Sequence, residues 1–167
     1  SSGLFTGAES WVQLSSANTG VAGNSIQQGE VIDFNFYNTD PGNTAGAAPT
    51  TSATGFYIQI DQFNSNSEDF IVVLKLADPN DPANFLSYAL RVDSNDVLTT
   101  SPTGYPALTG ANQGIIIIEP SDYANLPGVP AGYEIVGAQF LTSTQGQTVT
   151  LYDFNGAVGA GGTGQAV

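Results

Sequence analysis

The chain has 167 residues, 41% of them hydrophobic, so it is long enough to bury the core of one domain. Its formal net charge of −13, with only two basic residues, argues against nucleic acids and anionic membranes as partners, because both attract clusters of Lys and Arg. Since Cys and His are absent, disulfides, Cys/His zinc sites, thiol nucleophiles and His-based triads are excluded.

Short apolar runs between turn residues predict an all-β protein. Apolar and polar residues alternate over residues 31–37 and 55–63, which indicates strands with one face in the core. Residues 70–77 are apolar on both faces, as is typical of a central strand, and Lys75 near their end is expected to pair with an acid. We expect eight strands, at residues 11–14, 31–37, 55–63, 70–77, 85–92, 115–118, 133–142 and 147–154.

The expected strands predict a single antiparallel β-sandwich, jelly-roll-like, with long loops and bound calcium. The last two strands are expected to form a hairpin across residues 143–146, and residues 121–126 could form one helical turn. Residues 18–30 are interpreted as a turn-rich link. We expect the domain to span residues 1–156, with residues 157–167 as a Gly/Ala-rich tail or linker.

Acidic residues are concentrated in turns between residues 61 and 96. Two of these turns share a spacing, Asp78-x-Asn80-Asp81 and Asp93-x-Asn95-Asp96. Carboxylate and amide oxygens are ligands that calcium prefers, and a chain with two basic residues cannot neutralise so many acids itself. The pattern therefore predicts calcium at both turns, although Asp and Asn also cap ordinary turns.

Further candidates lie in loops. Asp40 and Asn43 flank the Pro41-Gly42 turn of the long loop 38–54, and Glu119 and Asp122 follow a buried apolar run, so Asp40, Glu119 and Asp122 are predicted calcium ligands. A second long loop covers residues 99–114, and loops of this length are usually functional or mobile. The predicted ligand-binding residues are Asp40, Gly42, Asn43, Tyr105 and Tyr123.

Of three functional classes, one is set aside and two remain open. An enzyme without His or Cys would need a carboxylate pair, as in glycoside hydrolysis, and no strand carries such a pair in a recognisable pattern, so we predict no enzymatic activity. A sugar-binding module would show exposed aromatic residues near calcium. A structural spacer would use calcium only for rigidity, but spacers are usually shorter and lack long loops.

Three segments together resemble the ligand-binding β-sandwich domains of giant RTX adhesins of Gram-negative bacteria. They are "TGVAGNSIQQGEVIDFNFY" (residues 19–37), "GFYIQIDQF" (55–63) and "VDSND" (92–96). The resemblance implies a calcium-rich module of a large secreted adhesin at the bacterial cell surface. One kind of these modules binds a free peptide C-terminus in a calcium-containing pocket.

Elementary electrostatics favours the same kind of ligand. A surface this negative repels an anion unless a bound metal captures it. Backbone N–H groups of residues 40–46 could add hydrogen bonds to a terminal carboxylate. We therefore expect a calcium-dependent module that recognises the C-terminus of a peptide or protein on another cell, with a glycan as the alternative ligand and a monomeric isolated domain.

Overall fold

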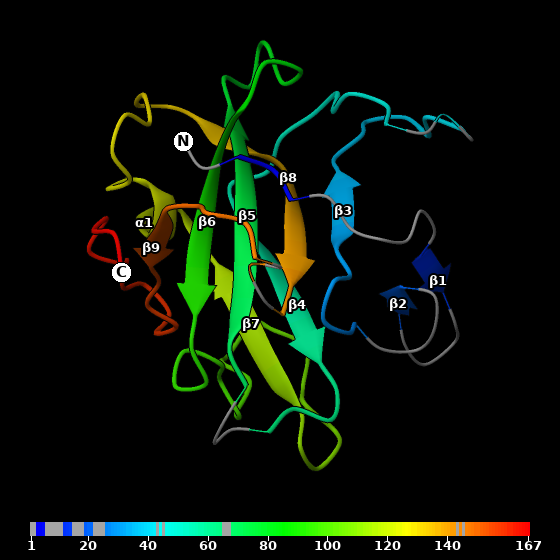
Figure 1. Cartoon of the computed structure of the whole chain (residues 1–167), viewed down its shortest axis with the longest axis vertical. Coiled ribbons are helices and arrows are strands. Elements are labelled where there is room, and N and C mark those ends of the chain that lie inside the picture. Colours follow the sequence, from blue (N-terminus) through cyan, green and yellow to red (C-terminus); the bar gives the residue numbers. More distant parts are fainter. Residues whose placement is uncertain are drawn as a thin grey trace.

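The computed structural model describes residues 3–5, 26–42, 44, 46–64, 68–142, 144 and 146–167, together with the backbone of residues 12–14 and 19–21. Within these ranges the chain is almost entirely strand and loop, which confirms the all-β prediction (Figure 1). The elements are β1 Val12–Leu14, β2 Thr19–Val21, β3 Ile32–Asn35, β4 Phe56–Ile60, β5 Phe70–Ala77, β6 Leu86–Val92, β7 Gly114–Ile118, α1 Pro120–Tyr123, β8 Glu134–Leu141 and β9 Leu151–Asp153.

The described strands form three sheets. The large sheet has the order β3-β8-β5-β6-β9, the small sheet consists of β4 and β7, and β1 pairs with β2. β2 lies in the segment that the sequence predicted as a turn-rich link, so that prediction was wrong there. Trp11 and Asn43 lie outside the described residues.

Two predictions about strand pairing were wrong. β8 pairs with β3 and β5, while β9 joins β6 at the far edge of the large sheet, so β8 and β9 do not form a hairpin. The β6–β9 pair is also parallel, so the sheet is not purely antiparallel. A turn signal in the sequence indicates a change of direction, but it does not determine which strand the chain joins next.

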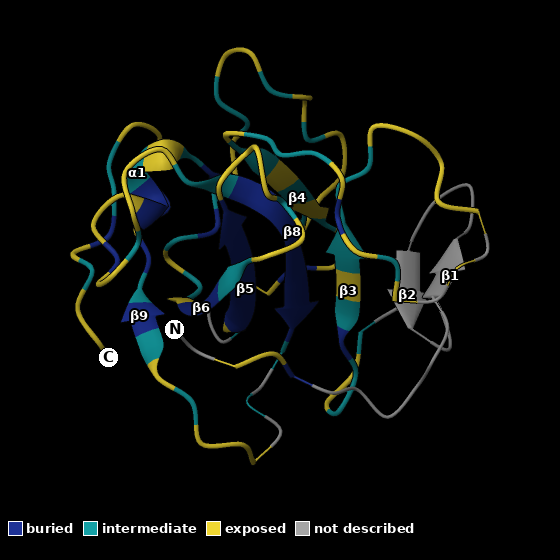
Figure 2. Ribbon diagram, turned by 90° about the horizontal axis from the view of Figure 1, so that it is seen from above, coloured by how far each residue is buried: buried dark blue, intermediate teal, exposed yellow. Residues whose placement is uncertain are grey.

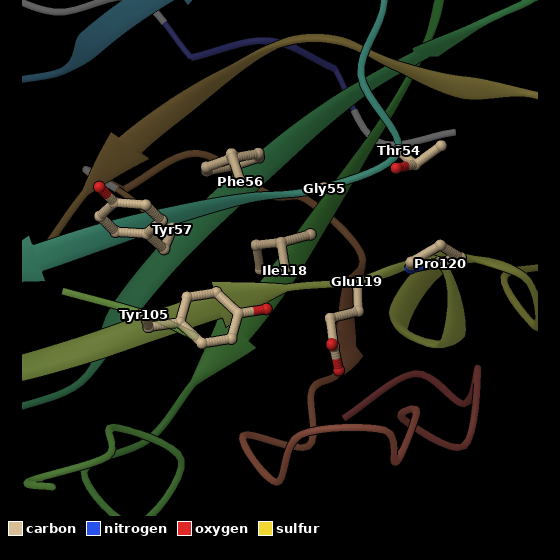
Figure 3. Close-up of a pocket in the computed structure, with 8 residues that line it drawn as sticks. All are labelled: Thr54, Gly55, Phe56, Tyr57, Tyr105, Ile118, Glu119 and Pro120. Atoms are coloured by element: carbon tan, nitrogen blue, oxygen red, sulfur yellow. The ribbon is translucent and has the colours of Figure 1, made fainter. Parts of the chain in front are cut away.

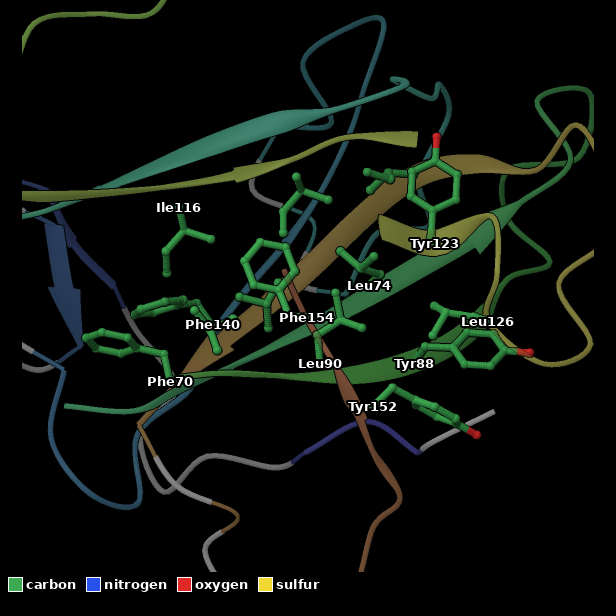
Figure 4. Packing of buried hydrophobic residues seen from close by; sticks show 14 of the residues in the cluster. Phe70, Leu74, Tyr88, Leu90, Ile116, Tyr123, Leu126, Phe140, Tyr152 and Phe154 are labelled. Atoms are coloured by element: carbon green, nitrogen blue, oxygen red, sulfur yellow. The ribbon is translucent and has the colours of Figure 1, made fainter. Parts of the chain in front are cut away.

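Most large apolar side chains lie between the large and small sheets. Alternate residues of β5, including Val72 and Leu74, meet Leu90 of β6, Ile116 of β7 and Phe140 of β8 in one buried cluster (Figure 4). On the opposite face of β5, Ile71 and Val73 belong to a second, smaller cluster. Every residue of β5 is buried, which confirms its prediction as a central strand.

Lys75 is buried on this second face and pairs with Asp33 of β3, as the sequence predicted that it would pair with an acid. Its Nζ also donates to Asn35 Oδ1 at 2.7 Å. Gly137 of β8 lies opposite both Lys75 and Asn35, and a Cβ there would come within 2.7 Å of Asn35 Oδ1. The missing side chain therefore leaves the space through which Lys75 reaches β3.

Residues 157–167, expected as a tail or linker, pack against the edge of the large sheet. The Asp153 N–H donates to the Gln165 carbonyl at 3.0 Å, and the Val167 N–H donates to the Leu151 carbonyl at 2.9 Å. Tyr152 and Ala166 form an antiparallel bridge. The segment therefore continues the large sheet beyond β9.

Candidate functional site

Glu119 and Asp122 meet where the buried strand β7 runs into α1. Pro120 begins the helical turn, and its fixed φ suits that position. The Glu119 N–H donates to Asp122 Oδ2 at 2.7 Å, which folds the Asp122 side chain back toward the end of β7. Asp122 is 4% exposed, so a carboxylate is held in the protein interior.

The second oxygen of Asp122 has an unusual environment. Asp122 Oδ1 and the neighbouring Ser121 Oγ are buried without a hydrogen-bond partner among the described residues. Burial, together with the charges of Glu119 and Asp96, raises the pKa of Asp122 to about 7, against the lowering effect of the Glu119 N–H. A buried polar atom without a partner is costly, so this oxygen is poorly satisfied by the protein alone.

Asp96 reaches the same region from the turn that follows β6. Its Oδ2 accepts from the Asp93 N–H at 3.0 Å and its Oδ1 from the Gly156 N–H at 3.2 Å. Burial and the charges of Asp93 and Asp153 nevertheless raise the pKa of Asp96. Because Asp96 also raises the pKa of Asp122, the acids of these two loops lie within electrostatic reach of each other.

Residues 156–164, which we call the glycine segment, bind the acidic loops through backbone groups. The Gly159 N–H donates to Glu119 Oε2 at 2.6 Å, and the Thr163 hydroxyl donates to Asp153 Oδ2 at 3.2 Å. With the Gly156 bond to Asp96, three carboxylates from separate parts of the chain, including Asp153 at the end of β9, therefore accept hydrogen bonds from one short segment. Backbone N–H groups here take the role that Lys and Arg cannot fill in this chain.

Glycine is required in this segment because the backbones approach closely. A Cβ on Gly161 would lie 1.9 Å from the Ser121 carbonyl oxygen, and a Cβ on Gly156 would lie 1.8 Å from that of Asp96. Sequence reasoning did not find these residues. The repeated Gly of residues 156–164 was the available signal, but the same composition is typical of a flexible linker.

A surface pocket of about 300 Å³ opens beside Glu119. Tyr57 of β4 and Tyr105 of the long loop 99–114 meet edge to face across it, with ring centroids 6.0 Å apart and planes at 89°. Figure 3 shows the Tyr105 hydroxyl directed toward the Glu119 side chain. The lining residues are Thr54, Gly55, Phe56, Tyr57, Tyr105, Ile118, Glu119 and Pro120.

Partial burial, the charge of Glu119 and a hydrogen bond with Glu119 raise the pKa of the Tyr105 hydroxyl. Glu119 thus belongs both to the wall of this pocket and to the acidic cluster, which we define as Asp93, Asp96, Glu119, Asp122 and Asp153. Tyr123, predicted to bind ligand, is 5% exposed, and its hydroxyl donates to the Thr54 carbonyl at 3.0 Å. It therefore supports the pocket from beneath.

No family model, characterised protein or solved structure matches the chain.

The remaining predicted residues lie elsewhere. β5 and β6 are an antiparallel pair, so the turn 78–81 and the turn 93–96 are at opposite ends of it and do not share one site. Asp78 Oδ1 accepts from the Asn80 N–H at 2.9 Å, whereas Asp81 is exposed. Asp40 Oδ1 accepts from the Gly42 N–H at 2.8 Å in an exposed turn that does not line the pocket.

Within the described residues, no group of three or more acidic side chains is arranged as a metal-binding set. The side-chain atoms near Asp122 that could ligate a metal are all oxygens, which suits a hard cation such as calcium rather than a softer transition metal. No helix in the described ranges is long and apolar enough to cross a membrane.

Proposed function

We propose that the chain is a calcium-dependent binding module that captures the C-terminus of a peptide or protein. The observation that carries this proposal is the double position of Glu119, in the wall of the tyrosine pocket and in the acidic cluster. A cation held by the cluster would lie beside the pocket. The adhesin resemblance supports a location at the bacterial cell surface, in a β-sandwich domain of a larger secreted protein.

Asp122, Glu119 and Asp96 are the proposed calcium ligands, with Ser121 contributing its hydroxyl, and calcium would draw these carboxylates into a set that the described residues do not form without it. The buried Asp122 Oδ1 and Ser121 Oγ lack partners in the described part of the chain, and a cation would satisfy both. The pKa of Asp122 is raised because its carboxylate is buried near other negative groups. The Gly156 and Gly159 N–H groups hold Asp96 and Glu119 in place, so the glycine segment is proposed as part of the site.

A peptide carboxylate is the ligand that this arrangement favours. The chain carries a net charge of −13, and an anion would approach it only at a local positive charge. Calcium bound by the cluster supplies that charge and a coordination position for the ligand. The rings of Tyr57 and Tyr105 offer apolar contact to the residue beside the carboxylate.

Calorimetric titration tests the proposal directly. Peptides of mixed sequence with free or amidated C-termini would be titrated into the protein in calcium and in chelator. We expect binding only with calcium and a free carboxylate, and at least about a tenfold loss in Glu119→Gln. Asp81→Asn removes one charge from an exposed turn outside the site and serves as the control.

A glycan is the second candidate ligand. The edge-to-face pair of Tyr57 and Tyr105 beside a carboxylate also suits a sugar, which can stack on an aromatic ring and donate hydrogen bonds from its hydroxyl groups to Glu119. A glycan array probed in calcium separates the two ligands. Glycan binding without peptide binding would replace the peptide proposal, and silence in both assays would favour a calcium-rigidified spacer.

A further inference from the structure

Lys75 is a buried amine that the proposed calcium site does not use. It lies on the central strand β5, its side chain is 3% exposed, and its Nζ lies 5.6 Å from the centre of the Phe85 ring. Figure 2 shows β5 and β8 buried inside the large sheet and β3 less buried at its edge. A lysine amine is a strong nucleophile once it has lost a proton, so the groups around Nζ determine whether it reacts.

Two polar side chains of β3 contact Nζ. Nζ pairs with Asp33 and donates to Asn35 Oδ1 at 2.7 Å. Asp33 and Asn35 are next but one to each other on the strand, so both side chains lie on the same face of the sheet. β8 lies between β3 and β5, and its Gly137, opposite both Asn35 and Lys75, has no side chain to separate them. The amine, the carboxamide and the carboxylate therefore meet at one point.

Both partners of Lys75 are held in place by further hydrogen bonds. Asp33 Oδ2 accepts at 2.8 Å from Nε2 of Gln139, a residue that is 2% exposed. Asn35 Nδ2 donates to the Ala47 carbonyl at 2.9 Å, so the carbonyl end of the carboxamide is directed at the amine. Groups that are held in contact react far faster than the same groups free in solution.

We propose that Lys75 and Asn35 form an intramolecular amide, with Asp33 as the group that carries the proton. Asp33 takes one proton from the Lys75 ammonium, and the free amine attacks the side-chain carbonyl carbon, Cγ, of Asn35. The bond between Nζ and Cγ forms, and the bond between Cγ and Nδ2 breaks. The departing nitrogen takes a second proton from Nζ and the proton held by Asp33, and it leaves as ammonium. No oxidant, metal or further reactant is needed.

The product is a covalent link from the edge strand β3 across β8 to the central strand β5. The chain has no Cys, so a disulfide cannot take this role. A cross-link between residues 35 and 75 restricts the unfolded chain, and the melting temperature should therefore be higher with the amide than without it. The ion pair of Lys75 and Asp33 is the state before the reaction.

Intact-mass spectrometry of the denatured full-length chain tests the proposal. The unaltered chain should be lighter than its sequence by the mass of one ammonia. Lys75→Arg keeps the positive charge but has no amine that attacks, and it should show its full sequence mass. Because Lys75 and Arg91 are the two basic residues, trypsin should cut the unaltered chain after Arg91 alone, and should cut Lys75→Arg at both positions. Tandem mass spectrometry of a second digest should find Lys75 joined to Asn35.

A full sequence mass with cleavage after Lys75 in the unaltered chain would overturn the proposal. Loss of one water in place of ammonia would put the bond on Asp33 and would overturn it as well. Ring closure at Asn155-Gly156 also releases ammonia, but that product reacts with hydroxylamine and does not depend on Lys75. An ammonia loss that persists in Lys75→Arg would therefore count against the amide.

Asp33→Ala tests the proton carrier separately. It should keep its full sequence mass, and loss of ammonia in this variant would overturn the role of Asp33. Circular dichroism establishes first that the variant is folded; if it is not, Asp33→Ser, which keeps a polar group but no carboxylate, replaces it. The result from the unaltered chain does not depend on either variant.

Discussion

Replacing Asp122 by Asn should stabilise the calcium-free protein and reduce the stabilisation that calcium provides. The pKa of Asp122 is raised from 3.8 to about 7, so keeping this carboxylate ionised in the calcium-free folded protein at pH 8 costs up to about 4 kcal/mol. Asn removes the charge but keeps an oxygen that accepts from the Glu119 N–H. We expect Asp122→Asn to gain about 1–3 kcal/mol in chelator, because burying the amide offsets part of the gain.

In saturating calcium the same substitution should lose most or all of this gain. A ligand that binds only the folded state stabilises it in proportion to the logarithm of its affinity. Loss of a charged ligand that weakens calcium binding tenfold removes about 1.4 kcal/mol, and a hundredfold loss removes twice that. The calcium-induced stabilisation should therefore shrink below that of the unaltered chain.

Urea denaturation at pH 8, followed by the fluorescence of the tyrosines and the single Trp, measures both effects on one protein. Asp81→Asn, which removes a charge from an exposed turn, should leave the response to calcium unchanged. Destabilisation of Asp122→Asn in chelator would mean that Asp122 is a structural cap. An undiminished response to calcium would place the cation elsewhere and refute the reasoning.

Three other predictions follow from the same contacts. The pKa of Asp122 is higher in the folded than in the unfolded protein, so the stability in chelator should be greatest below about pH 4 and should fall as the pH rises to about 7. Urea denaturation midpoints measured across this range check the prediction, and a flat profile would contradict it. Gly161→Ala should lower the free energy of unfolding by about 1–3 kcal/mol and weaken calcium binding, because its Cβ would lie 1.9 Å from the Ser121 carbonyl oxygen. Calorimetry and denaturation measure the two effects, with Gly3→Ala, whose Cβ meets no neighbour, as the control. Compared with chains in which Lys75 has not reacted with Asn35, Lys75→Met should lower the free energy of unfolding by about 1–3 kcal/mol, a modest loss because the half-exposed Asp33 left behind can be hydrated. The loss should be the same with and without calcium, and a calcium-dependent loss would tie this ion pair to the acidic cluster.

Local pattern was sufficient to predict the hydrophobic centre of the fold. The two-sided apolar run of β5 and the alternation of β3 and β4 each reflect burial of a short segment, and burial is encoded residue by residue. Pairing between distant strands is different, because β9 joins β6 through backbone groups that any sequence can provide. The predicted hairpin was therefore wrong, because a turn signal does not specify the strand that follows it.

The site was predictable only in part, for a related reason. Glu119 and Asp122 were predicted as calcium ligands because they follow a buried apolar run, and the structure brings Asp122 within electrostatic reach of Asp96. The matched spacing of residues 78–81 and 93–96 does not indicate a shared site, because the two turns lie at opposite ends of one strand pair. Gln139 and the glycine segment were missed, because their roles depend on hydrogen bonds to distant parts of the chain that the local sequence does not reveal.

The two basic residues leave the acidic cluster without a positive side chain. Lys75 is buried and pairs with Asp33 on the far face of the large sheet, whereas Arg91 pairs with Asp69 at 3.1 Å on the surface. Each described positive side chain is therefore committed to an acid outside the acidic cluster, where the chain instead uses backbone N–H groups of the glycine segment. Such groups orient carboxylates but bring no net charge, so the repulsion around Asp122 persists. A site that orients acids without neutralising them gains most from a mobile divalent ion, and calcium binding should therefore couple directly to the stability of this end of the domain.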